Sequence, residues 1–185
     1  MLRESETLNP TYLALPLVRA ELYYYWRRYD DSIDLIRQVE QVDRDPKDGA
    51  GSLILVRDFL ELHRAPEAEQ AARKIFGTDP PAIARTALAP CLAAAGRPDE
   101  AAALMRQVVA NLRSDPIDPY TIALAYARMH DRAATLAWLE TALRDRTPDL
   151  VSARWDPALD FVRGEARYER VVAGFPAALT AEGSR

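Results

Sequence analysis

The sequence is poor in the residues that most often build metal, redox and phosphate sites. Its 185 residues include one cysteine, Cys91, and two histidines, His63 and His130. It contains no paired cysteines, no His-Glu-x-x-His motif, no Ser, His and Asp at triad spacing, and no glycine-rich phosphate loop. We therefore expect a protein that is not an enzyme, holds no metal and uses no cofactor.

The sequence also lacks a basic cluster. Lys47 and Lys74 are its only lysines, and its 24 basic side chains are outnumbered by 28 acidic ones, with both signs scattered along the chain. A surface that binds nucleic acid needs clustered positive charge to meet the phosphates. The net charge of −4 therefore argues against direct nucleic-acid binding.

Long apolar runs are missing as well. The first ten residues, MLRESETLNP, are charged where a signal peptide would be apolar, and the run TYLALPLV ends at Arg19. Cys91 lies in an alanine-rich stretch and has no second cysteine to pair with, which suits a reducing compartment. These features predict a cytoplasmic protein without a membrane span.

The sequence does contain a clear helical periodicity. It has seven glycines and no strand-type alternation, and its apolar residues recur every three or four positions, as at Leu136, Leu139 and Leu143. This pattern predicts an all-helical chain. Pro16 and Pro90 fall inside predicted helices, and we expect the first helix to begin near Pro16. Proline and glycine place the breaks between helices at residues 44–52, 77–81, 95–100, 114–119 and 146–149.

The predicted turns within pairs of helices are regularly spaced. Arg27, His63, Gly96 and His130 follow one another at intervals of 36, 33 and 34 residues. Glycine is usual at such a turn, so the two histidines indicate polar residues tolerated in the left-handed backbone region rather than bases or metal ligands. Paired helices with a period near 34 are typical of tetratricopeptide repeats.

In these features the chain resembles the tetratricopeptide repeat family. Its fourth copy carries the family's pattern of apolar, small and large residues at Ile122, Ala123, Tyr126, Leu139 and Ala142. The resemblance implies one domain over residues 1–185, an all-α, right-handed solenoid of antiparallel helix hairpins. The four degenerate repeats are expected at residues 12–46, 49–81, 82–115 and 116–148.

Residues 149–178 depart from the repeat and resemble the tail that follows such arrays in bacterial multidomain proteins. Tyr168, Val171, Val172 and Phe175 fall on one helical face, so we expect a final helix that packs its apolar stripe on the fourth repeat. This segment would cap the exposed end of the solenoid. Trp155 is expected to anchor the chain where it crosses to that helix.

Four consecutive aromatics at residues 23–26 cannot all face one core, because a helix turns 100° per residue. The repeat register assigns Tyr23 and Trp26 to packing, and Tyr24 and Tyr25 to the concave groove. In the family this groove binds a peptide or a partner helix. Its expected lining here is Glu21, Tyr24, Tyr25, Arg57, Leu60, Glu61, Tyr120, Leu124 and Arg128.

The sequence therefore predicts a non-catalytic scaffold for protein–protein interaction. Two other functions stay open at this point. The chain could be a regulatory or sensor portion of a larger bacterial transcription regulator or signalling kinase, or a small-molecule binder or enzyme with a pocket between solenoid and cap. Self-association through the uncapped first hairpin is a further expectation, with Trp26 and Tyr29 as its candidate surface.

Overall fold

The computed structural model describes residues 11–42 and 49–174, and the regular structure of these residues is entirely helical. The prediction of an all-α chain is confirmed. The predicted break at 44–52 lies partly, and Phe175 entirely, outside the described residues. The elements are α1 (Thr11–Tyr25), α2 (Tyr29–Val42), α3 (Ala50–Glu61), α4 (Ala65–Lys74), α5 (Ala82–Ala94), α6 (Pro98–Ala110), α7 (Pro119–Arg128), α8 (Arg132–Arg144), the 3-10 helices η1 (Pro148–Arg154) and η2 (Pro157–Val162), and α9 (Ala166–Gly174).

Consecutive helices pack in pairs, α1 with α2, α3 with α4, α5 with α6 and α7 with α8. Every pair turns in the same way. Arg27, His63, Gly96 and His130 have φ values of 59°, 56°, 78° and 56°, so the left-handed conformation predicted for the two histidines is confirmed. In each turn, the residue that follows the left-handed one donates its backbone N–H to the carbonyl oxygen of the residue five positions before it, at 2.8 to 3.0 Å. This bond closes the end of the first helix of each pair.

The prediction that the first helix begins near Pro16 is wrong. Helix α1 begins at Thr11 and contains Pro16, and α5 runs through Pro90 from Ala82 to Ala94. A proline inside a helix removes one backbone hydrogen bond to the preceding turn. Pro16 is the sixth residue of α1, past the first four N–H groups that lack an intrahelical partner, so α1 loses an internal bond just as α5 does. In both helices the remaining turns hold the helix together.

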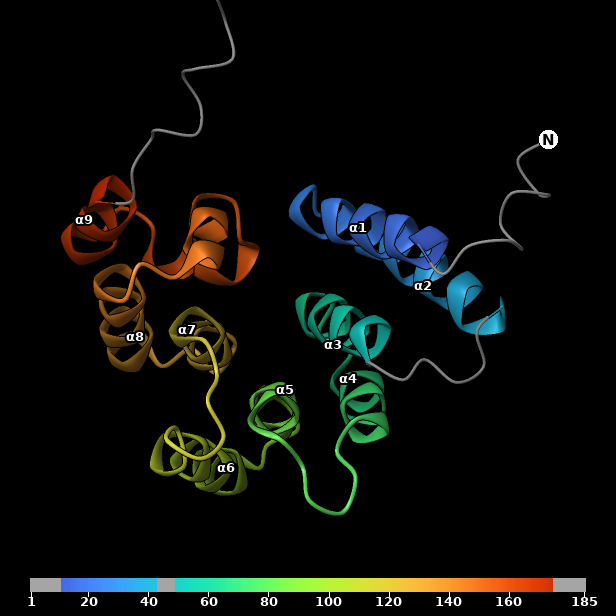
Figure 1. The fold of residues 1–185 in the computed structure, drawn as a ribbon, viewed down its shortest axis with the longest axis horizontal. Coiled ribbons are helices and arrows are strands. Elements are labelled where there is room, and N and C mark those ends of the chain that lie inside the picture. The colour runs from blue at the N-terminus through green and yellow to red at the C-terminus, as the bar shows by residue number, and fades with distance from the viewer. Residues whose placement is uncertain (1–10, 43–48, 175–185) are drawn as a thin grey trace, which may run out of the picture.

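The helices form a curved array in which α1, α3, α5 and α7 face inward and α4, α6 and α8 lie outside them (Figure 1). Helix α3 packs on α2, α5 packs on α4, and α7 packs on α5, so each hairpin contacts the next. Small residues allow this close approach. A Cβ atom added to Gly51 of α3 would lie 3.2 Å from the Ile36 side chain of α2, and Ala68, Ala72 and Ala89 are fully buried.

The chain then returns toward its beginning. Helix α9 packs on α8, with Tyr168 and Val171 buried, while η1 and η2 lie beside the C-terminal end of α1 (Figure 1). Trp155, expected to anchor this crossing, is instead 56% exposed. The neighbouring Asp156 is buried in its place, because its carboxylate caps η2 and meets α1.

Candidate functional site

Tyr24 is the aromatic of the 23–26 run that faces the interior. It is fully buried, whereas Tyr23 and Tyr25 are half-buried and Trp26 is 63% exposed. The expectation that Trp26 packs within or between the hairpins is therefore wrong, whereas the half-buried Tyr23 contacts the ring of Trp26 and the guanidinium of Arg28. Tyr24 lies one helical turn after the fully buried Ala20, and Trp26 lies one turn after the exposed Leu22, so the inward face of α1 is offset from the expected one.

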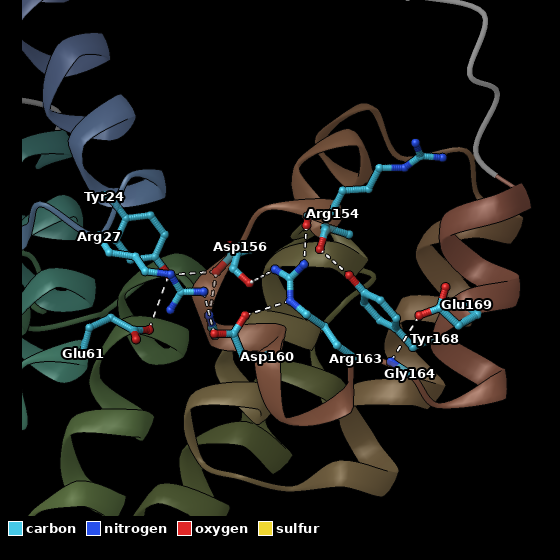
Figure 2. A network of polar contacts seen from close by, with 12 residues as sticks. Tyr24, Arg27, Glu61, Arg154, Asp156, Asp160, Arg163, Gly164, Tyr168 and Glu169 are labelled. Carbon is cyan, nitrogen blue, oxygen red and sulfur yellow. Dashed lines mark hydrogen bonds and ion pairs between the residues drawn. The ribbon is translucent and has the colours of Figure 1, made fainter.

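The Tyr24 side chain joins three distant elements. Its hydroxyl donates to Oδ1 of Asp156 at 2.8 Å and accepts from Nη2 of Arg128 at 3.2 Å, with Oε1 of Glu61 at 3.5 Å. The Arg57 guanidinium lies over the Tyr24 ring, 4.4 Å from its centre. Figure 2 shows Tyr24 reaching from α1 toward Asp156 and Glu61. Helices α1, α3 and α7 and the η1–η2 segment therefore meet at one residue.

Asp156 fixes the other side of this contact. Its carboxylate accepts from the hydroxyls of Tyr24 and Tyr120, the latter at 3.4 Å, and caps η2 by accepting from the backbone N–H of Ala158 at 3.0 Å. Nearer the surface, Arg27 of the α1–α2 turn forms an ion pair with Asp160 of η2 at 2.6 Å (Figure 2). We call the pairs Tyr24–Asp156 and Arg27–Asp160 the closure contacts, because they join the two ends of the array.

Of the closure contacts, Tyr24–Asp156 is buried, whereas the side chains of Arg27 and Asp160 are 54% and 42% exposed. Burial raises the pKa of the Tyr24 hydroxyl well above its usual value, so this group stays protonated and can donate to Asp156. Burial also raises the pKa of Glu61, which lies near the carboxylate of Asp156. Burial alone disfavours a charged Arg128, but Tyr24 and Asp156 outweigh it and raise the pKa of the guanidinium, which stays cationic.

A second buried carboxyl group lies beside this cluster. Asp58 of α3 is fully buried, and neither of its carboxyl oxygens has a hydrogen-bond partner among the described residues. The Ser32 hydroxyl donates to the Ala20 carbonyl at 3.0 Å. Burial raises the pKa of Asp58 to about 7, although the nearby Ser32, Arg57 and Arg128 each act to lower it. Asp58 is therefore protonated over much of the acidic range in the folded protein.

The inner surface holds a large cavity, which we call cavity one. It has a volume of ≈ 590 Å³, within the usual range for a ligand site. Its lining combines apolar side chains with a few polar and charged ones. These residues are Leu17, Val18, Glu21, Tyr25, Ala50, Leu53, Ile54 and Arg57 of the first two pairs, Ile83, Thr86, Ala87, Tyr120, Thr121, Leu124, Ala125 and Arg128 of the next two, and Asp149, Ser152 and Asp156 near η1.

Two arginines of cavity one have spare hydrogen-bonding capacity: Arg57, and Arg128, whose Nε atom is buried without a partner among the described residues. The Nη1 atom of Arg57 donates to Oε1 of Glu21 at 3.1 Å, and its guanidinium is stacked on Tyr24. The Nε and Nη2 atoms are buried and have no hydrogen-bond partner among the described residues. Because a buried donor without a partner is unfavourable, Arg57 is suited to bind a hydrogen-bond acceptor supplied from outside.

A second cavity of ≈ 540 Å³, cavity two, lies on the other side of the Tyr24 contacts. Arg128 lines both cavities. Residues of three hairpin turns and of η2 surround cavity two. They are Leu60, Glu61, His63, Ala65, Ala93, Ala94, Ala127, Arg128, Met129, His130, Pro157, Ala158, Asp160 and Phe161.

The predicted groove residues all lie on the inner side, but they do not form one continuous surface. Six of them line cavity one: Glu21, Tyr25, Arg57, Tyr120, Leu124 and Arg128. Leu60 and Glu61 line cavity two. Tyr24 lies between the cavities and is covered by Asp156. Whether these residues bind a partner stays a prediction.

Sequence reasoning missed the contribution of the C-terminal segment. Asp149, Ser152 and Asp156 line cavity one, and Asp160 lines cavity two. A local signal was present at Asp156, since an aspartate directly before a proline is a frequent helix cap. That signal predicts the start of η2, but it gives no indication that the same carboxylate meets α1.

The chain was compared with known proteins. No protein-family model matches it, and neither a curated protein nor a solved structure does. Within residues 11–42 and 49–174, no group of three or more His, Cys, Asp or Glu side chains is placed to hold a metal ion. No helix of this part of the chain is long and apolar enough to cross a membrane.

Proposed function

We propose that this chain is a non-catalytic, tetratricopeptide-like scaffold that binds a peptide or helix of another protein in cavity one. The observation that carries the proposal is the position of Arg57. It is held by Glu21 and Tyr24 and lines cavity one, and its buried Nε and Nη2 atoms have no hydrogen-bond partner among the described residues. A rigidly placed donor binds its acceptor at a low entropic cost.

The charges around cavity one favour a neutral acceptor over a carboxylate. Glu21, Asp149 and Asp156 are acidic, whereas Arg57 and Arg128 are basic, so the lining has an excess of negative charge. A backbone carbonyl of a bound peptide would satisfy Arg57 without adding to this excess. The apolar side chains of the partner would then contact the apolar lining residues, among them Leu17, Val18, Ile83 and Leu124.

A peptide-display screen on the purified protein tests this function. Thr121→Arg places a bulky side chain in cavity one, and Ala94→Arg does the same in cavity two as a matched control. We expect selected peptides to bind the wild-type protein and the Ala94→Arg variant, and to lose binding to Thr121→Arg. If no peptide is enriched, or if Thr121→Arg binds as well as the wild type, the proposal is wrong.

Cavity two supports a second candidate function, the binding of a small molecule between the hairpins and the C-terminal segment. Glu61, His63, His130 and Asp160 surround it, and its volume suits a metabolite. A metabolite that binds there should raise the thermal midpoint of the wild-type protein but not that of Ala94→Arg. A role as the regulatory portion of a larger protein stays a prediction from the sequence.

A further inference from the structure

Helix α1 and the η1–η2 segment meet at a boundary that we call the seam. The closure contacts cross it, with Tyr24 and Arg27 on one side and Asp156 and Asp160 on the other (Figure 2). Both are contacts between side chains. Within the described residues, no backbone hydrogen bond joins α1 to η1 or η2. The hydrogen bonding across the seam is therefore made by side chains alone.

The apolar core does not continue across the seam, because its buried residues form two clusters. Ala20 of α1 belongs to the first cluster, with residues of α2 to α6. Leu150 and Ala153 of η1 and Leu159 and Val162 of η2 belong to the second, with residues of α8 and α9. Of the described residues, no buried apolar side chain of α1 lies in the second cluster. Helix α7 contributes to both clusters, so they are joined through α7 and not at the seam.

The seam is thus the boundary at which the array can open without separating an apolar core. Arg27 and Asp160 are largely exposed, and an exposed ion pair contributes little to stability. The Tyr24 hydroxyl and the Asp156 carboxylate can exchange their hydrogen bond for bonds to water, so neither group is left without a partner. Parting α2 from α3 would instead expose Ile36, which is fully buried.

We propose that the seam is a clasp: the array opens between α1 and η1–η2, and this opening joins cavity one and cavity two. The Tyr24–Asp156 contact lies between the two cavities, and Arg128 lines both. With the contact parted, the inner side presents one groove that includes Tyr24. Such a groove admits a partner segment that is too long for either cavity. The opening goes beyond the proposed function and does not depend on it.

The Arg27–Asp160 pair makes the clasp sensitive to salt. Both side chains are in contact with water, so dissolved ions screen their attraction. The Tyr24–Asp156 contact is buried and is screened less. We expect higher salt to favour the open form while the helices stay intact.

Distances measured across the seam by double electron–electron resonance test the proposal. Spin labels are attached at Leu22→Cys of α1 and at Trp155→Cys between η1 and η2, where both native side chains are exposed, while the buried Cys91 escapes labelling. We expect a short and a long distance in the full chain, with the long one gaining population as salt rises. Tyr24→Phe should raise the ratio of open to closed form by about tenfold or more, because a hydrogen bond to a charged group is lost. Tyr23→Phe should leave the ratio unchanged.

A second pair of labels, at Asp34→Cys of α2 and Arg73→Cys of α4, is the matched control. Both native side chains are exposed, and their helices share the first apolar cluster, so this distance should be single and independent of salt. Far-UV circular dichroism checks that each labelled variant keeps its helices.

Three results overturn the proposal. The first is a single distance across the seam that neither salt nor Tyr24→Phe changes. The second is a change that the control pair shares, since the whole chain would then be loosening. The third is a response to Tyr23→Phe equal to the response to Tyr24→Phe. Because the measurement needs no ligand, its outcome is separate from that of the peptide screen.

Discussion

At the scale of single residues, the contacts of the interior converge on Tyr24. Its aromatic ring supports Arg57, and its hydroxyl lies between the carboxylate of Asp156 and the guanidinium of Arg128. Each of these charged groups is partly or fully removed from water. A buried charged group that lacks a hydrogen-bond partner is unfavourable. One hydroxyl group therefore stabilises two buried charges and fixes the position of Arg57 in cavity one.

Removing the Tyr24 hydroxyl should lower the stability of the protein strongly, although only one atom is lost from the side chain. We expect Tyr24→Phe to lower the free energy of unfolding by about 1.5 to 3 kcal/mol, because a buried hydrogen bond to a charged group is lost. Urea denaturation measures the change. Tyr23→Phe is the matched control, since the Tyr23 hydroxyl accepts a hydrogen bond from the exposed Arg19, and it should change stability by less than about 0.5 kcal/mol. Equal effects of the two variants would contradict the burial of Tyr24.

Asp58 should make stability depend on pH. Its pKa rises from 3.8 to about 7 on folding because the carboxyl group is buried. A raised pKa means that the folded state binds the proton more tightly. The stability contributed is therefore fully present below pH 3.8 and is lost as the pH rises through about 7. Arg57, Arg128 and Glu61 are the charged groups that act on this carboxyl.

The neutral variant Asp58→Asn isolates this effect. It should be more stable than the wild type above pH 8 by roughly 2 to 4 kcal/mol, and the difference should shrink steadily as the pH falls from 8 to 5, reaching zero only below pH 3.8. Chemical denaturation of both proteins across this pH range measures the difference. A difference that does not vary with pH would show that Asp58 is ionised in the folded state at all these pH values.

At the scale of helices and turns, the repeated hairpin turn decides the architecture. The sequence predicts these turns well because each depends on a local feature, a residue that ends one helix in the left-handed region before the next begins. Trp155 and the 23–26 run were assigned less well. Which of their side chains are buried depends on segments far away in the sequence, and helical periodicity carries no information about those.

Gly96 allows a test of one turn. Its φ is +78°, and an added Cβ atom would meet nothing within 4 Å, so a substitution there strains the backbone without a steric clash. We expect Gly96→Ala to lower the unfolding free energy by about 1 to 2 kcal/mol, and Gly96→Asn to lower it by less, because asparagine tolerates this region better. If alanine were as stable as glycine in urea denaturation, this turn would not have the left-handed conformation.

At the scale of the whole molecule, the closure contacts set the shape of the candidate site. Tyr24 and Asp156 are 132 positions apart in the sequence, yet their side chains share a hydrogen bond. The sequence predicts the inner lining contributed by the helix pairs, because that lining follows the helical register. It does not predict that η1 and η2 divide the inner side into two cavities, since the C-terminal segment has no repeat register of its own.

A double-mutant cycle on Tyr24→Phe and Asp156→Ala measures this central contact directly. We expect the two destabilisations not to be additive, with an interaction energy of at least about 1 kcal/mol, because both variants remove the same buried hydrogen bond. A control cycle with Tyr23→Phe in place of Tyr24→Phe should be additive. If the Tyr24 cycle were additive within about 0.5 kcal/mol as well, the C-terminal segment would not rest on α1, and cavity one would not have the lining described.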